Sequence, residues 1–138
     1  MKRELGDFQT PRELAAAIVR GLGSIGTRWT RVLEPTCGTG TFLSVLLDAA
    51  HPPREMIGIE LQERHYAAAS SLAPGKNGTR VELIRASLFE LDLRTGLPWR
   101  ESGPLLVVGN PPWVTAAALG KLGSGNLPDK SNIKNLKG

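Results

Sequence analysis

Two short segments of the sequence concentrate residues that could bind a ligand and act on it. The first, Glu34 to Thr41, is a glycine-rich turn that begins with a carboxylate. A second carboxylate, Glu60, stands at the end of the apolar run Met56 to Ile59. Glycines let a ligand approach the backbone, and carboxylates pair with ammonium groups or accept hydrogen bonds from hydroxyls. The second segment, Asn110-Pro111-Pro112-Trp113, offers amide and carbonyl acceptors beside a flat ring. These segments predict a cofactor site next to a site for a planar group.

Three kinds of nucleotide ligand compete for the glycine turn. A P-loop requires Lys followed by Ser or Thr after its last glycine, and this pair is absent. A dinucleotide fingerprint requires a third small residue at position 43, where the sequence has Leu43. Glu34 would repel a pyrophosphate but can pair with an ammonium group, and Glu60 can accept both ribose hydroxyls. The two carboxylates favour S-adenosylmethionine, which carries an ammonium and a sulfonium instead of a pyrophosphate.

The Asn110 to Trp113 segment is suited to hold an amino group of a purine. Consecutive prolines stiffen a turn and remove backbone donors, so the carbonyls point outward. The Asn110 side chain and the Pro111 carbonyl can accept the two hydrogens of an exocyclic amine and aim its lone pair at a cofactor methyl. Trp113 offers a stacking face worth ~1–3 kcal/mol per base. No general base is required, because orientation alone can contribute ~7–11 kcal/mol and the methylated amine is strongly acidic.

Strands and helices are expected to alternate along the chain. Thr10 as cap, Pro11 in the first helical position and Glu13 completing a capping box predict a helix start. Apolar spacing predicts helices over residues 11–22, 41–50 and 62–72 and strands over 31–34, 56–60, 81–86 and 105–108. Right-handed crossovers then give an α/β, Rossmann-like parallel sheet with helices on both faces and strand order 3-2-1-4. Ligands of such sheets bind at the carboxyl ends of the strands, where the two segments lie.

The composition agrees with a globular cytoplasmic protein. The 138 residues carry 17 basic and 13 acidic side chains, and 41% are apolar, which suits one domain. Cys37 is the only cysteine, which excludes an internal disulfide and fits a reducing compartment. No apolar run approaches the ~20 residues of a membrane span. His51 and His65 lack partners at metal-ligand spacing, so no metal site is expected.

Together, the motifs resemble the N6-adenine DNA methyltransferases of the class I S-adenosylmethionine-dependent superfamily. Gly6 to Pro11 is similar to that family's first cofactor motif, and Glu34 to Gly40 to its glycine loop. Ile57 to Leu61 is similar to its ribose-binding strand end, and Asn110 to Trp113 to its catalytic loop. The catalytic tetrapeptide is shared with methyltransferases of RNA bases and of protein glutamine. The N-terminal hexapeptide favours DNA adenine.

The resemblance implies a role for each matching residue. The residues expected to contact the cofactor are Phe8, Thr10, Pro11, Glu34, Cys37, Gly38, Gly40, Glu60 and Ser87. Of these, Ser87 stands where the family usually has an Asp against the cofactor adenine. Asn110 and Pro111 would hold the target adenine and Trp113 would stack on it. The adenine would be flipped out of the duplex, which costs a few kcal/mol.

The implied activity is methyl transfer from S-adenosylmethionine to adenine N6 in DNA, within a restriction-modification or related system. RNA or protein-glutamine methylation and a non-catalytic cofactor- or DNA-binding fragment are the alternatives. Residues 1–119 are expected to form a methyltransferase domain that is incomplete on its C-terminal side, because the family's sheet has three further strands. Residues 120–138 would be a basic loop or tail. The fourth strand would then be an open edge, which predicts poor solubility or assembly with a second chain.

Overall fold

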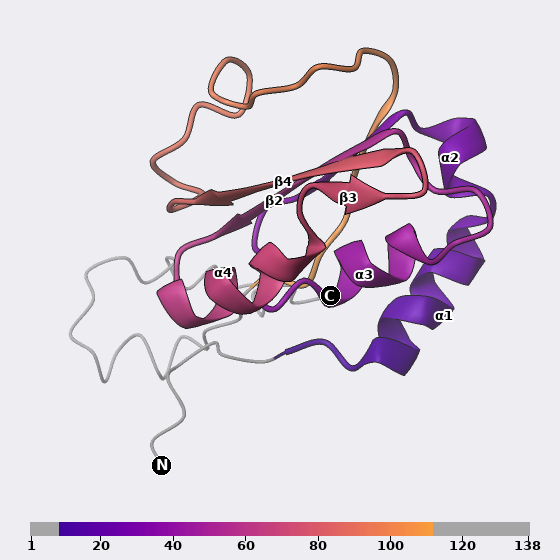
Figure 1. Ribbon diagram of the computed structural model, residues 1–138, viewed down its shortest axis with the longest axis horizontal. Coiled ribbons are helices and arrows are strands. Elements are labelled where there is room, and N and C mark those ends of the chain that lie inside the picture. Colours follow the sequence, from indigo (N-terminus) through magenta and orange to yellow (C-terminus); the bar gives the residue numbers. More distant parts are fainter. Residues whose placement is uncertain (1–8, 112–138) are drawn as a thin grey trace, which may run out of the picture. The chain divides into compact units, whose positions relative to one another are not determined.

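The computed structural model describes residues 9–111, which form a five-stranded sheet with flanking helices (Figure 1). The strands are β1 Arg31–Glu34, β2 Glu55–Glu60, β3 Gly75–Lys76, β4 Thr79–Arg85 and β5 Leu105–Val107. The helices are α1 Arg12–Leu22, α2 Ile25–Arg28, α3 Thr41–Leu47 and α4 Glu63–Ala69, and a 3-10 turn, η1 Ser70–Leu72, follows α4.

The order of the strands across the sheet is β3-β4-β2-β1-β5. The pairs β4–β2, β2–β1 and β1–β5 are parallel, and the two-residue β3 pairs antiparallel with β4. The four parallel strands therefore have the predicted order 3-2-1-4, and the α/β, Rossmann-like sheet is confirmed. Leu33 of β1 lies opposite Ile57 of β2 and Val107 of β5, so the carboxyl ends of these strands share one edge.

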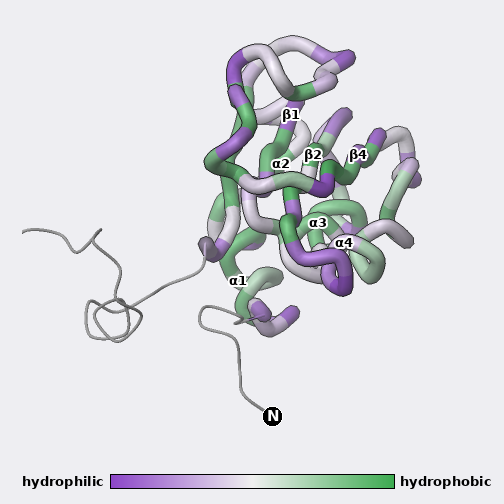
Figure 2. Tube along the Cα trace, turned by 90° about the vertical axis from the view of Figure 1, so that its left-hand side faces the viewer, coloured by the Kyte–Doolittle hydropathy of each residue, from purple (hydrophilic) through white to green (hydrophobic). Residues whose placement is uncertain are grey.

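Each face of the sheet contributes to a separate apolar cluster. Val32, Met56 and Val81 face one side and pack with buried residues of α1, α3 and α4. Leu33 and Ile57 face the other side, where the segment between β4 and β5 covers them through Leu97, Leu91 and Trp99. Figure 2 shows the apolar residues concentrated along the strands and α3. Within residues 9–111, the helices thus cover one face and the non-helical residues 86–104 cover the other, whereas helices were expected on both faces.

Several elements differ from expectation at their ends. The predicted capping box is wrong, because Pro11 itself occupies the N-cap position of α1 and no side chain caps the helix. Pro11 has an extended ψ of 140°, so the helix begins one residue later and Thr10 is one residue too early to cap it. Helix α3 ends at Leu47, three residues before the predicted end at residue 50. The short α2 and β3 were not predicted.

A buried carboxylate fixes the segment that covers the second face. Glu55, at the start of β2, is fully buried. It forms an ion pair with the half-buried Arg80 of β4 and accepts hydrogen bonds from the backbone N–H groups of Arg100 and Glu101 at 2.8–3.1 Å. Since residues 100–101 lie just before β5, Glu55 joins the middle of the sheet to the chain that leads into its edge strand.

Gly26 of α2 is a position where a side chain should not fit. Its N–H donates to the His51 carbonyl at 2.8 Å, and an added Cβ would lie 2.2 Å from the Pro52 carbonyl oxygen. We expect Gly26→Ala to lower the free energy of unfolding by ~1–3 kcal/mol, as overpacking does, in urea denaturation followed by circular dichroism. Gly21→Ala in α1 is the control, since a Cβ there meets nothing within 4 Å and should stabilise by ~0.5–1 kcal/mol. Equal effects of the two substitutions would contradict this packing.

Candidate active site

The glycine turn joins β1 to α3 and is anchored to β2. The Cys37 N–H donates to the Ile59 carbonyl at 2.8 Å, and the Gly40 N–H closes the turn on the Cys37 carbonyl at 2.9 Å. Gly38 and Gly40 have positive φ angles of 57° and 87°, which a residue with a side chain rarely adopts. Gly40 then caps α3. The turn therefore holds its backbone close to the carboxyl end of β2.

The residue Gln9 ties the N-terminal motif to this turn. Its side-chain oxygen accepts hydrogen bonds from the Thr39 N–H at 3.1 Å and the Thr39 hydroxyl at 3.3 Å. This contact brings Thr10 and Pro11, both predicted cofactor residues, next to the turn. Gln9 itself was not singled out from the sequence, although its amide within the Gly6 to Pro11 motif was the signal. Phe8 lies outside the described residues.

Glu60 lies at the predicted place, at the end of β2 against the turn. Its Oε2 accepts a hydrogen bond from the Gly38 N–H at 2.9 Å, and its Oε1 accepts one from the Gln62 N–H at 2.7 Å. A carboxylate has about four acceptor positions, so both oxygens keep capacity for further donors. The two backbone bonds fix the carboxylate in one orientation, with Glu60 only partly buried.

Glu34 is more deeply buried than we expected for a residue at the mouth of the turn. It is 3% exposed, and its Oε2 has no hydrogen-bond partner among the described residues. Burial raises the pKa of the Glu34 carboxyl well above its usual range; the Leu43 backbone N–H opposes this, and the Glu60 carboxylate adds to it. The Thr36 hydroxyl, two residues on, is likewise buried and unpaired within this part of the chain. Two unsatisfied polar groups thus lie beneath the turn.

Cys37 is buried within the turn, and its thiol lacks the features of a nucleophile. Its side chain is 4% exposed, and its Sγ lies 3.8 Å from the Gly38 carbonyl oxygen. Burial raises the pKa of the Cys37 thiol, and the carboxylates of Glu34 and Glu60 raise it further. The thiol therefore stays protonated, and the cofactor contact expected of Cys37 remains a prediction.

The chain that leaves β5 passes beside Glu34. The Val108 N–H donates to the Leu33 carbonyl at 3.0 Å, and a Cβ added at Gly109 would lie 3.4 Å from the Glu34 Cγ. Asn110 and Pro111 follow directly and are exposed. The structure therefore brings the first two residues of the predicted catalytic loop to the edge that carries the glycine turn. Pro112 and Trp113 lie outside the described residues.

Ser87 and two apolar residues border the same edge. The Ala86 N–H donates to the Glu60 carbonyl at 3.2 Å, which places Ser87 next to the end of β2. The Ser87 hydroxyl accepts a hydrogen bond from the Phe89 N–H at 3.3 Å. Leu61 and Phe89, two apolar residues that the sequence analysis did not single out, are 61% and 95% exposed. The signal for Leu61 is an apolar residue directly after the polar end of β2, whereas Phe89, four residues after the end of β4, has no such signal.

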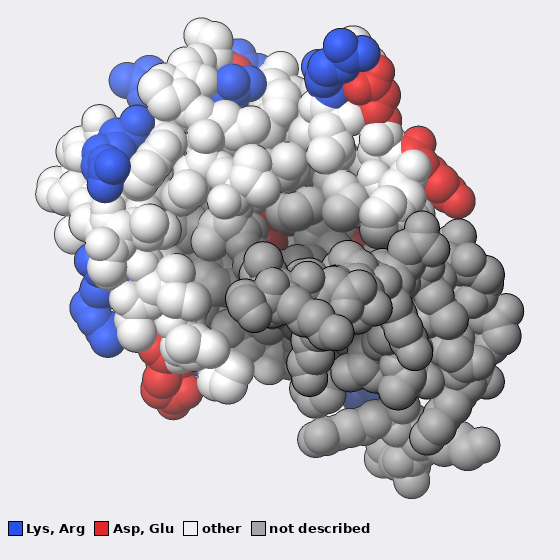
Figure 3. All heavy atoms as spheres, turned by 180° about the vertical axis from the view of Figure 1, so that it is seen from behind, with Lys and Arg blue, Asp and Glu red and all other residues white. Residues whose placement is uncertain are grey.

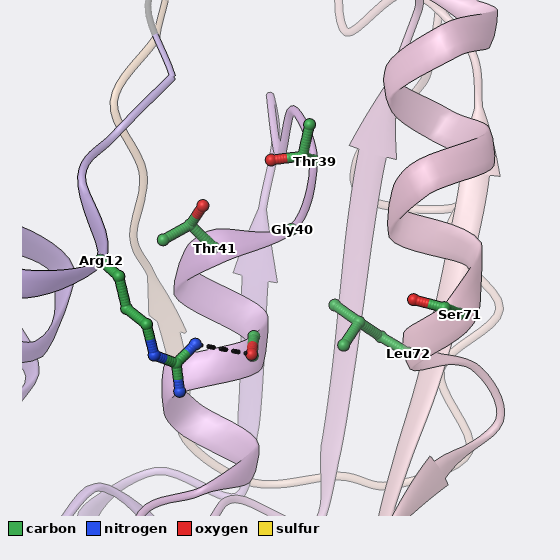
Figure 4. A pocket seen from close by; sticks show the side chains of 7 residues that line it. Arg12, Thr39, Gly40, Thr41, Ser71 and Leu72 are labelled. Carbon is green, nitrogen blue, oxygen red and sulfur yellow. Dashed lines mark hydrogen bonds between the residues drawn. The ribbon is translucent and has the colours of Figure 1, made fainter.

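A separate cavity opens along α3 (Figure 4). Its volume is about 270 Å³, and its lining residues are Arg12, Thr39, Gly40, Thr41, Ser44, Ser71 and Leu72. Arg12 donates hydrogen bonds to Ser44 and Asp48, both at 2.8 Å, so its guanidinium is already paired. The cavity shares Thr39 and Gly40 with the glycine turn but includes none of Glu34, Glu60 and Asn110. The predicted chemistry therefore lies beside this cavity, at the carboxyl edge of the sheet.

One face of the described residues carries its Lys and Arg side chains mainly at the rim (Figure 3). On the face opposite to that of Figure 1, Lys and Arg side chains lie along the outline and do not gather in the middle (Figure 3). Among residues 9–111, no helix is long and apolar enough to span a membrane. The same residues contain no group of three or more His, Cys, Asp or Glu side chains arranged to hold a metal ion.

Comparison with known proteins gives two curated relatives. The chain is 30% identical to the Type II methyltransferase M.NspV of Nostoc sp. over 137 residues, which are 99% of this chain and 28% of that protein. This chain is similar in sequence to Type II methyltransferases. A second match, Type II methyltransferase M.CvrRI of Paramecium bursaria Chlorella virus XZ-6E, is 30% identical over 110 residues, 80% of this chain and 25% of that protein. The chain thus spans about a quarter of the length of these relatives.

No protein-family model matches the chain. Solved structures with partial likeness include EvdMO1, with 23% identity and a TM-score of 0.46 over 67% of this chain and 22% of that one. Another is the apo form of the mycolic acid cyclopropane synthase CmaA1, with 20% identity and a TM-score of 0.46 over 62% of this chain and 32% of that one.

Proposed function

We propose that this chain carries the cofactor site and the catalytic loop of an S-adenosylmethionine-dependent methyltransferase that acts on adenine N6 in DNA. The observation that carries the proposal is the meeting of Glu34, Glu60 and Asn110 at one edge of the sheet, around a turn with two positive-φ glycines. The similarity to Type II methyltransferases supports methyl transfer as the reaction class.

The cofactor's groups match the chemistry of the residues at this edge. Glu60 is held by two backbone N–H groups with acceptor positions to spare, which suits the two ribose hydroxyls. The unpaired Oε2 of Glu34 suits the ammonium of the methionine part. Ser87 and the exposed Leu61 and Phe89 suit the polar edge and the faces of the adenine. When bound, S-adenosylmethionine supplies an electrophilic methyl group on its sulfonium.

The catalytic loop acts by holding the target amine. The Asn110 side-chain oxygen and the Pro111 carbonyl accept the two hydrogens of adenine N6, which directs the nitrogen lone pair toward the methyl. Such orientation can supply ~7–11 kcal/mol, and the proton leaves the methylated nitrogen late, because that nitrogen is strongly acidic. Trp113 would stack on the base, which must first leave the duplex.

The choice of DNA adenine rests on the N-terminal motif. The hydrogen bonds between Gln9 and Thr39 favour a cofactor role for Gly6 to Pro11, the segment that resembles the DNA adenine enzymes more than those acting on RNA or protein glutamine. We place the activity in the cytoplasm, in a restriction-modification or related system. A second chain that pairs with β5, an edge strand within residues 9–111, would supply further strands.

A methylation assay tests this proposal. The purified chain is incubated with methyl-labelled S-adenosylmethionine and, in parallel, with duplex DNA, structured RNA or a glutamine-containing protein, and the products are digested for mass spectrometry. We expect N6-methyladenine in the DNA sample alone. Methyl transfer to RNA or protein would contradict the choice of substrate. Cofactor binding without transfer to any of the three would support the non-catalytic alternative.

A further inference from the structure

Glu34 is a buried acid that has no positively charged partner among residues 9–111. Its side chain is 3% exposed, and it takes part in no ion pair formed by residues 9–111. Its Oε2 is fully enclosed and has no hydrogen-bond donor within the described part of the chain. An ionised carboxylate left in such a place would cost several kcal/mol, so buried acids without partners take up a proton instead.

The groups that face Glu34 come from each neighbouring element. The end of β2 contributes the Glu60 carboxylate, and the glycine turn contributes the Cys37 thiol. Helix α3 contributes the Leu43 N–H, and the chain after β5 contributes Gly109, which has no side chain. One neighbour is negative, two are neutral and one is a single backbone donor. Burial and the Glu60 charge therefore raise the pKa of Glu34, and only the Leu43 N–H opposes them.

We propose that Glu34 is protonated in the free protein and ionises when the ammonium group of S-adenosylmethionine binds, so that cofactor binding releases a proton. This inference rests on the proposed cofactor site. The O–H bond of the Glu34 carboxyl breaks and its proton passes to the buffer. The ammonium keeps its three hydrogens and pairs with the carboxylate, and no other bond changes.

The proton release determines how the affinity for S-adenosylmethionine changes with pH. The pKa of Glu34 is raised in the free protein, and a bound ammonium lowers it. Between these two pKa values, affinity for the cofactor rises about tenfold for each unit by which the pH increases. Above the upper value the affinity is constant, because the carboxyl is already ionised. A ligand that keeps the adenosine but lacks the ammonium releases no proton from Glu34.

Isothermal titration calorimetry of the whole chain tests this inference. S-adenosylmethionine is titrated near pH 7 in buffers of different ionisation enthalpy, and the slope of the observed heat gives the number of protons exchanged. 5′-Methylthioadenosine, which lacks the amino acid part, is the matched ligand. We expect release of up to about one proton with S-adenosylmethionine and none with methylthioadenosine. Glu34→Gln should abolish the release, whereas Glu82→Gln, on β4, should retain it.

The outcomes separate this inference from the proposed function. If both ligands bind with the same proton exchange, or if Glu34→Gln retains the release, the inference is wrong while the cofactor site stands. If neither ligand binds to the folded chain, the proposed function fails, and the inference fails with it. A carbon-13 titration of the glutamate carboxyl groups gives a result without ligand. A Glu34 signal that is fully ionised near pH 7 in the free protein would overturn the inference.

Discussion

Replacement of Glu55 by alanine is expected to lower the free energy of unfolding by about 3–5 kcal/mol, the usual cost of removing one partner from a buried ion pair. Glu55 is fully buried, and its loss would leave the half-buried Arg80 without its main counterion. The backbone N–H groups of Arg100 and Glu101 would lose their acceptor as well. Urea denaturation followed by circular dichroism measures this change.

The matched control for Glu55 is the second carboxylate on the same arginine. Glu82 also forms an ion pair with Arg80, but its side chain is 39% exposed. We expect Glu82→Ala to cost less than ~1 kcal/mol, because water screens the pair and replaces the lost hydrogen bonds. If the two alanine variants are equally stable, Glu55 does not anchor the segment that covers the second face.

Replacement of Asn110 by alanine is expected to slow methyl transfer by about 10²–10³-fold while affinity for S-adenosylmethionine stays unchanged. Removal of one group that stabilises a transition state by hydrogen bonding typically has this effect. Asn110 is exposed and follows Gly109, which lies against Glu34, so Asn110 borders the proposed cofactor site. Single-turnover rates of N6-methyladenine formation and calorimetric affinities separate the two quantities.

The aspartate variant sharpens the interpretation of Asn110. Asn110→Asp keeps a side-chain oxygen that can accept a hydrogen bond, so it should retain more activity than the alanine variant. An alanine variant that transfers methyl groups at the rate of the parent chain would exclude the proposed role. A parallel loss of cofactor affinity would mean that Asn110 acts in binding instead.

The strand order could be predicted because it depends on local patterns and on one chirality rule. The predicted bounds of β1 agree with the structure at both ends, since a short apolar run begins after Arg31 and Pro35 follows the strand. Right-handed crossovers between successive parallel strands predicted the observed order of these strands, although no helix lies between β4 and β5. The carboxyl ends of β1, β2 and β5 had to meet, and with them Glu34, Glu60 and Asn110.

The depth of Glu34 and the role of Gln9 could not be predicted. Glu34 ends a strand next to a turn, a place that is usually open. Gly109, which is 75 positions later in the chain and follows β5, lies against it. Gln9 contacts Thr39 across 30 positions. Both contacts are non-local, so neither apolar periodicity nor motif spacing records them. The four-residue α2 and two-residue β3 are too short to produce a pattern.

The binding of S-adenosylmethionine to the purified chain is the measurement that tests the central claim most directly. We expect saturable binding that Glu60→Ala weakens by about 10–100-fold, because hydrogen bonds to a charged group contribute about 1.5–3 kcal/mol. Glu63→Ala, which removes an exposed carboxylate three residues after Glu60, should bind within about twofold of the parent chain. A folded chain that does not bind the cofactor, or a Glu60→Ala variant with undiminished affinity, would contradict the proposed site.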